Sequence, residues 1–233
     1  MNFSLQVLLE TVLIVLEVVP RTLLLALLIL AIGIILGAII ALINRNRIPV
    51  LTQIVNLFVS YMRGVPLIIH LFIIRYSLPE ATAGFLSIFG VTTDPNEFPT
   101  LLMAITAFSL LQIAFESENI RSAFQSVPDS QVEAGMSIGY TRSQNMRRVI
   151  VPQALTIAVP LFLNSYIKII KSLSLAFAVG VVEIFAQARF AAALSYRYLE
   201  SYVAAAVVYW IVCGILQIVV NKIQERLSVN ESA

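Results

Sequence analysis

Charged and hydroxyl-bearing side chains interrupt the apolar stretches of this sequence at a few places, and these places can do chemistry. Arg63, Lys171 and Glu183 stand in long apolar stretches, and Ser172 and Ser174 follow Lys171 closely. A charge inside a bilayer costs about 2.5–3.5 kcal/mol on insertion scales, so such groups tend to face an interior. Arg63 or Lys171 suits a carboxylate, Glu183 suits an ammonium, and the two serines add hydroxyl partners. These residues predict a site for a zwitterion.

Two segments carry most of these groups and break the helical pattern around them. They are Arg63-Gly64-Val65-Pro66 and Lys171-Ser172-Leu173-Ser174. Unwound backbone at mid-membrane offers N–H and C=O groups to a ligand, provided that it lines a cavity. Arg75, nearer the outside, favours anionic or carboxylate-rich substrates as they approach. In a second interpretation, Arg63, Lys171 and Glu183 pair with each other or with helix ends and hold the broken spans together.

The composition indicates the environment in which these residues act. The chain has 233 residues, of which 59% are hydrophobic and 12% charged, and its mean hydropathy is +0.92. Soluble domains carry roughly 25% charged residues, about twice this share. The sequence therefore predicts an all-α, polytopic integral membrane protein in contact with lipid. A formal net charge of only +2 argues against a nucleic-acid-binding protein.

Several kinds of chemistry lack their residues. The sequence contains no G-x-x-x-x-G-K-[ST] phosphate loop and no H-E-x-x-H, and its only histidine and cysteine are His70 and Cys213. No convergent nucleophile and base stand out either. We therefore expect a non-catalytic chain without a metal or another cofactor of its own, and we expect His70 to pack and form hydrogen bonds.

Apolar segments long enough to cross a bilayer divide the chain into five expected spans within one domain, residues 1–233. The expected spans are 19–43, 50–78, 98–116, 153–182 and 201–221, with a polar loop over 117–150. Residues 3–18 form either an amphipathic interfacial helix or an outward extension of the first span. They lack the basic start of a signal peptide. Gly33 and Gly37 form a G-x-x-x-G that favours close helix packing.

Basic residues gather in alternate connections, which predicts the orientation of the chain in the cell membrane. Placing the N-terminus outside and the C-terminus in the cytoplasm leaves only Arg189 and Arg197 in outer loops. The cytoplasmic segments then hold Arg45, Arg47, Arg121, Arg142, Arg147, Arg148, Lys222 and Arg226.

The polar loop has a pattern of its own. Residues 130–138 can form a short helix, Gly139 can end it in a left-handed conformation, and residues 141–149 can form a second helix that leads into the fourth span. Two short helices at an angle make a compact projection. Taken alone, the pattern also fits an ordinary solvated loop.

The residues of this loop resemble the cytoplasmic signature of binding-protein-dependent ABC importers. That signature has Glu-Ala-Ala, three residues, Gly, and a downstream Ile/Val-x-Pro, and this chain has Glu133, Ala134, Gly135, Gly139 and Pro152 at those places. Gly135 replaces the second Ala and loosens the helix by about 1 kcal/mol. The resemblance implies that these residues form the coupling helix, which sits in a groove of the ATPase subunit.

Other segments are similar to the polar amino acid permeases of this class, a group that includes histidine, glutamine and cystine permeases. The similar segments are Met62–Leu67, Leu71–Pro79, Glu118–Pro128, Lys171–Glu183 and the pairs Tyr209-Trp210 and Glu225-Arg226. Val65, Arg75, Ser172 and Leu173 depart from the usual residues, and these departures bear on substrate choice.

The resemblance implies a fold, a function and partners. We expect the five-helix fold of a type I ABC importer permease that moves a polar amino acid or a related compound across the membrane. It implies two ATPase subunits that bind ATP, an external solute-binding protein, and a second permease, identical or different. The alternatives are a secondary transporter or channel that works without nucleotide, and an intramembrane enzyme; the long polar loop and the lack of an inverted repeat argue against the former.

Overall fold

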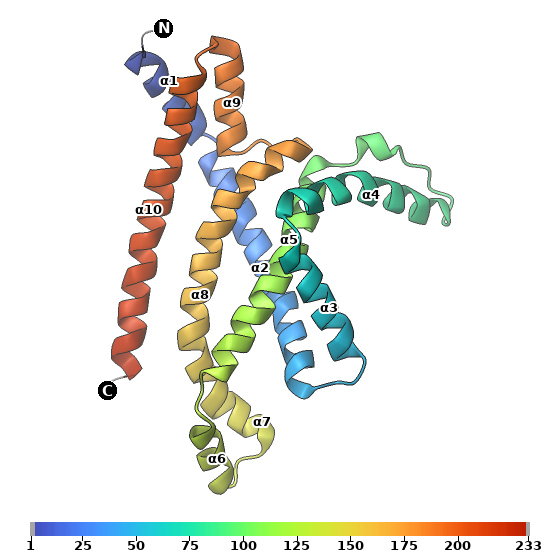
Figure 1. Cartoon of the computed structure of the whole chain (residues 1–233), viewed down its shortest axis with the longest axis vertical. Coiled ribbons are helices and arrows are strands. Elements are labelled where there is room, and N and C mark those ends of the chain that lie inside the picture. The colour runs from blue at the N-terminus through green and yellow to red at the C-terminus, as the bar shows by residue number, and fades with distance from the viewer. Residues whose placement is uncertain (1–2, 232–233) are drawn as a thin grey trace.

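A computed structural model describes residues 3–231 of the chain, with side chains described as far as residue 227, and these residues are helical apart from short connections (Figure 1). The α-helices are α1 Leu5–Leu16, α2 Val19–Asn46, α3 Leu51–Gly64, α4 Leu67–Ser87, α5 Thr100–Gln125, α6 Asp129–Ser137, α7 Arg142–Asn145, α8 Val151–Ser172, α9 Ile184–Ser195 and α10 Tyr198–Glu231. Two 3-10 segments, η1 Pro95–Glu97 and η3 Leu173–Val179, and one π-helical segment, η2 Met146–Ile150, complete them.

Within residues 3–231, four helical stretches are long and apolar enough to cross a membrane: α2, α5, the run from α7 through η3, and α10. A fifth candidate is the pair α3 and α4, which bends by 111° between Gly64 and Leu67. The all-helical class and the membrane-spanning character expected from composition are therefore confirmed. The second expected span, 50–78, is not one straight helix, because the chain turns sharply at Val65-Pro66.

The helices α2 and α5 cross in close contact at the centre of the molecule, and glycine makes this possible. A Cβ added at Gly37 would lie 2.9 Å from the Ser117 backbone nitrogen, and one added at Gly33 would lie 2.7 Å from Gln112 Cγ. The packing role expected of the G-x-x-x-G is thus confirmed, and α5 occupies the space that larger side chains on α2 would fill. The main core forms here, with Ile29, Leu71 and Ile170 fully buried.

Several helices extend further than the apolar patterns predict. Helix α4 contains Pro79 and continues to Ser87. The connection that follows the expected span 50–78 therefore begins later than predicted. Helix α5 continues to Gln125 rather than ending near 116, because apolar residues in its last turns, such as Ala123, still pack against Ile150 and Ala154. The polar loop proper therefore begins after Gln125.

The segment after α8 is broken, as the sequence predicts. Helix α8 ends at Ser172, η3 follows, and Gly180 takes a left-handed conformation with φ 88°. Helix α9 then starts at Ile184 and packs with α1 and α10 around Val15, Ala188 and Val208. Helix α1 is distinct from α2, and a turn at Glu17-Val18 separates the two.

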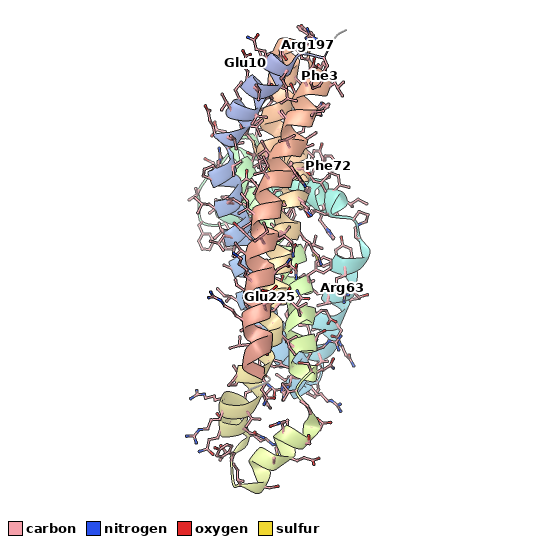
Figure 2. The ribbon with its side chains drawn as sticks, turned by 90° about the vertical axis from the view of Figure 1, so that its left-hand side faces the viewer. Phe3, Glu10, Arg63, Phe72, Arg197 and Glu225 are labelled. Atoms are coloured by element: carbon pink, nitrogen blue, oxygen red, sulfur yellow. The ribbon has the colours of Figure 1, made fainter. Side chains whose placement is uncertain are left out.

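The arrangement places functional elements at different heights of the molecule. In Figure 1 the N-terminus and α9 lie at one end, and α6 and α7 project at the other, the end toward which α10 runs. Figure 2 shows Glu10 and Arg197 at the N-terminal end, Glu225 near the opposite end of α10, and Arg63 and Phe72 on the side away from α10. The described residues thus form a long bundle from which α4 extends to one side and the compact unit of α6 and α7 projects at one end.

Candidate functional site

The projection at one end of the bundle is built by α6, α7 and the turn between them. Helix α6 ends at Ser137, and Gly139 follows with φ 89°, donating its N–H to Met136 O at 2.9 Å. A Cβ on Gly139 would meet nothing within 4 Å, so backbone conformation alone favours glycine there. The short helix, its glycine stop and the second helix were all predicted, and they are confirmed.

A close contact between Gly135 and Asn145 locks the two helices of the projection together. Asn145 is 1% exposed and donates from Nδ2 to Val132 O at 2.7 Å. A Cβ added at Gly135 would lie 2.3 Å from Asn145 Oδ1, which is far too close. Gly135 therefore makes room for Asn145, and the departure from the family pattern has a packing reason that the sequence interpretation missed.

The outer surface of the projection is part apolar and part charged. Glu133 and Ala134 are exposed, and the nearby Met136 and Ile138 expose 47% and 71% of their surface. Exposed apolar side chains beside a charged one are typical of a protein–protein contact. The geometry supports docking to a partner subunit at this end.

The base of the projection is tied directly to two of the long helices. Pro152 lies at the start of α8, inside a continuous helical run, and directly follows the π-helical segment η2, whose widened turn accommodates a residue without an N–H. Ala123 on α5 packs in one buried cluster with Ile150 and Ala154. Displacement of the projection must therefore reach both α5 and α8.

A buried polar network runs along α5 toward the middle of the bundle. Glu116 is 0% exposed; Gln112 Nε2 donates to its Oε1, and Asn119 Nδ2 donates to its Oε2 at 2.8 Å. Asn119 also reaches Ser165 Oγ on α8 at 3.2 Å. Sequence reasoning missed this network, although Gln112, Glu116 and Asn119 at i, i+4 and i+7 share one helix face.

A cavity of about 430 Å³ opens beside this network, between α5 and α8 and under the start of α4. Its volume lies within the usual range for small-molecule sites. The side chains of Lys168 and Lys171 line it, and both lysines are exposed. The remaining lining residues are Leu67, Phe108, Leu111, Gln112, Phe115, Asn119, Ser165, Ile169 and Ser172.

The two serines of the lysine segment face different spaces. Ser172 lines the cavity and donates its hydroxyl to Lys168 O at 2.7 Å. Ser174 donates to Lys171 O at 2.9 Å and lines a second cavity, of about 360 Å³, with Tyr202 and Tyr209. Lys171 lines both cavities, so it stands at the boundary between them.

Glu183 lies in a different setting from the one expected of an ammonium partner. It is 1% exposed, and its carboxylate accepts hydrogen bonds from the N–H groups of Phe185 and Ala186, at 2.9 and 2.8 Å, and from the Tyr209 hydroxyl at 2.6 Å. These bonds cap the N-terminus of α9. In this conformation Glu183 serves a helix end, as the second interpretation proposed, and it lines neither lysine cavity.

Arg63 likewise has a partner of its own at the end of α3. Its Nη1 lies 3.4 Å from Glu118 Oε2, which also holds Arg121 Nη2 at 2.6 Å. The Arg63 guanidinium carbon lies 5.9 Å from the ring centroid of Phe115, a residue of the cavity wall. Arg63 thus stands at the margin of the cavity, and the structure does not bring it together with Glu183.

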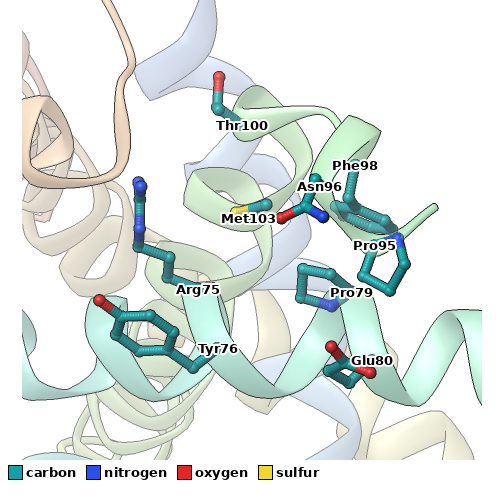
Figure 3. A pocket seen from close by; sticks show the side chains of 9 residues that line it. All are labelled: Arg75, Tyr76, Pro79, Glu80, Pro95, Asn96, Phe98, Thr100 and Met103. Atoms are coloured by element: carbon teal, nitrogen blue, oxygen red, sulfur yellow. The ribbon is translucent and has the colours of Figure 1, made fainter.

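Arg75 lines a separate, smaller pocket of about 230 Å³ between α4 and the start of α5 (Figure 3). Figure 3 shows Arg75 and Tyr76 extending from α4, with Thr100 and Met103 contributed by α5. Glu80 also lines this pocket. The loop that closes it, including Pro95 and Asn96, precedes α5.

His70, expected to pack and form hydrogen bonds, does only the first. It is 4% exposed and meets the Tyr61 ring edge-on at a centroid distance of 5.4 Å. Neither ring nitrogen has a hydrogen-bond partner among the described residues. Within the same part of the chain, no group of three or more His, Cys, Asp or Glu side chains is placed to hold a metal ion.

Comparison with known families and proteins gives a consistent picture. Residues 33–229 match the family described as the binding-protein-dependent transport system inner membrane component. The chain is 38% identical to the probable amino-acid permease protein YxeN of Bacillus subtilis, covering 91% of this chain and 90% of that one. It is also 38% identical to the probable amino-acid ABC transporter permease protein PatM of Vibrio harveyi, covering 93% and 92%. A third relative is the L-cystine transport system permease protein TcyB of Bacillus subtilis, at 40% identity over 84% and 78%.

Solved structures show the same arrangement of helices. A chain of an amino acid ABC transporter crystallised with histidines superposes with a TM-score of 0.83 at 26% identity, covering 97% of this chain and all of that one. A chain of the inward-facing MetNI methionine ABC transporter superposes with a TM-score of 0.71 at 19% identity, covering 92% and 96%, and shows likeness of fold alone.

Proposed function

The chain belongs to the family of binding-protein-dependent transport system inner membrane components, and we propose that it imports a polar amino acid or a related compound. It is the permease subunit of an ABC importer and contributes the membrane path rather than the hydrolysis of ATP. The observation that carries the proposal is the projection formed by α6 and α7, whose Gly139 stop and exposed Glu133 stand on a chain that matches the family over residues 33–229.

Energy for transport comes from partner subunits. Two ATPase subunits bind ATP and dock on the projection through Glu133, Ala134 and the exposed apolar residues beside them. Gly135, Gly139 and Pro152 keep the shape of the projection and its junction with α8. The chain itself needs no metal or cofactor for this role.

A second permease, identical or different, and a solute-binding protein complete the proposed transporter. One chain with five crossings leaves its cavities open at the side, so a second permease is needed to enclose a path. The binding protein docks on the outer side, at the end where α1 and α9 lie, and the Arg75 pocket lies on the way inward from it. In this orientation the N-terminus is outside, the C-terminus is cytoplasmic and α6 and α7 face the cytoplasm.

The substrate path follows the cavities that Lys171 joins. Lys171 and Ser172 line the larger cavity, Ser174 lines its neighbour, and both spaces lie beside the break at the end of α8. Arg63 borders this path, Glu183 supports it by holding the start of α9, and Arg75 marks the outer approach. In this proposal Glu183 supports the path by capping α9 and does not make the contact with the substrate ammonium that the sequence first suggested.

The docking of the projection is open to a direct test. We would place a cysteine at Ala134, in a Cys213→Ala background, co-express the chain with its ATPase partner and apply a short bifunctional crosslinker. A cysteine at Leu194, which is 85% exposed at the end of α9, serves as the matched control.

The proposal predicts a crosslink to the ATPase from position 134 and none from position 194. A secondary transporter or channel has no such partner, so absence of co-purification and of any crosslink from position 134 contradicts the proposal.

A further inference from the structure

We propose that the cavity between α5 and α8 takes a substrate with net negative charge, such as a dicarboxylic amino acid. The proposed transport function leaves the charge of the substrate undetermined. The inference rests on that function and concerns the substrate class. It starts from the charges that face the cavity, all of which are positive.

Lys168 and Lys171 both belong to the wall of the same cavity. They stand three positions apart on α8, so they share a face of the helix, and both line the cavity. Like charges at this spacing repel each other. Among the described residues, no side chain forms an ion pair or a hydrogen bond with either ammonium. An anion between them would remove the repulsion.

The carboxylates nearest to the cavity are committed elsewhere. Glu116 is fully buried and accepts from Gln112 and Asn119, so its influence on Lys168 is electrostatic and at a distance. Glu118 holds Arg63 and Arg121. The described lining contains no carboxylate, which leaves its charge balance positive.

The neutral polar groups of the wall fit the same ligand. Ser165 and Ser172 add hydroxyl groups to the wall, beside the amides of Gln112 and Asn119 that hold Glu116. Ammonium–carboxylate hydrogen bonds are roughly twice as strong as neutral ones, so two carboxylates on one substrate use the cavity better than a single carboxylate. A neutral amino acid leaves one lysine without a counter-charge.

The outer pocket also has a positively charged residue in its wall, together with one acidic residue. Arg75 lines it, and Glu80 is the acidic residue in the same wall. Arg75 has no ion-pair partner within the described part of the chain. An anionic substrate thus meets an unpaired cation at the outer pocket and two more in the cavity.

Isosteric pairs of amino acids test the inference in the complete transporter. Membrane vesicles would contain the permease with its ATPase and binding protein, and the probes would be radiolabelled L-glutamate with L-glutamine and L-aspartate with L-asparagine. The readout is ATP-dependent uptake of each acid divided by that of its amide. Comparing variants in this ratio isolates the permease, because the binding protein is the same throughout.

We expect the wild-type ratio to favour the acids. Lys168→Gln and Lys171→Gln should each lower the ratio about tenfold, the loss expected for one charge-assisted hydrogen bond. Lys168→Arg, which keeps the positive charge, should keep the acid-to-amide ratio near its wild-type value. Lys222→Gln, which removes an equal charge at an exposed position outside the cavity, should leave it unchanged.

The outcomes separate this inference from the function on which it rests. ATP-dependent uptake that favours the amides, or acid-to-amide ratios unchanged in both lysine variants, overturns the anionic substrate and leaves the import function standing. Absence of ATP-dependent uptake of all twenty standard amino acids contradicts the import function, and the inference falls with it.

Discussion

Replacing Gly135 by Ala tests whether the coupling projection depends on its contact with Asn145. The added methyl group would lie 2.3 Å from Asn145 Oδ1, so the Asn145 side chain must move. Moving it gives up the bond from Nδ2 to Val132 O in a buried position, which costs about 1–3 kcal/mol. Alanine regains about 1 kcal/mol through its higher helix propensity. The cost exceeds the gain over most of this range, so we expect Gly135→Ala to destabilise the protein by up to about 2 kcal/mol.

The sign of the effect should reverse when the obstacle is removed. In an Asn145→Ala background the methyl group at position 135 meets no amide, and only the propensity gain of about 1 kcal/mol remains. The assay is the thermal unfolding midpoint of the purified protein in detergent for all four chains of the cycle. Gly84→Ala, at a helical glycine with nothing within 4 Å, controls for the propensity effect alone.

A cycle in which Gly135→Ala shifts the midpoint equally in both backgrounds would refute this reasoning. It would mean that the projection adjusts without cost and that Gly135 is present for another reason. Coupling between neighbours in contact is typically 0.5–3 kcal/mol, large enough to be resolved.

Three further predictions concern topology, coupling and the path. With Thr93→Cys and Ser143→Cys, a membrane-impermeant thiol reagent should label intact cells only at position 93, and the reverse pattern overturns the orientation. Gly139→Val should uncouple ATP hydrolysis from uptake, because φ at this position is 89° and valine disfavours a positive φ. Gly139→Asn should retain most transport, because asparagine tolerates the left-handed region. Equal transport by both variants would show that the backbone conformation at Gly139 does not matter for coupling. Ser172→Ala should weaken apparent transport affinity several-fold with little loss of stability, because the Ser172 hydroxyl bonds only a carbonyl of its own helix. If affinity is unchanged in both Ser172→Ala and Ser174→Ala, the substrate site lies elsewhere.

Features that depend on local chain chemistry were predictable from the sequence. The end of α3 at Gly64, the break after Ser172 and the left-handed Gly139 all follow from proline, glycine and polar residues inside apolar runs. Such signals act over a few residues and need no knowledge of distant neighbours. The close approach of α5 to Gly37 follows from the same kind of signal, the spacing of small residues.

Features that depend on partners distant in the sequence were not predictable. Glu116 is the last residue of the third expected span, and only the continuation of α5 and the approach of α2 and α8 bury it beside Ser165. Glu183 looks like a binding carboxylate, yet the start of α9 and the Tyr209 hydroxyl satisfy it. Lys168 was visible as an embedded charge, but its place beside Lys171 in one cavity required the packing of α5 against α8.

The central claim is that this chain moves a substrate at the expense of ATP hydrolysed by its partners. The direct measurement is uptake by reconstituted vesicles that contain the permease, the ATPase and the binding protein, with internal ATP and with all ion gradients collapsed. The account predicts substrate accumulation that requires ATP, the ATPase subunits and an intact projection, and that stops in Gly139→Val. Accumulation driven by an ion gradient without ATP, or without the ATPase subunits, would contradict it.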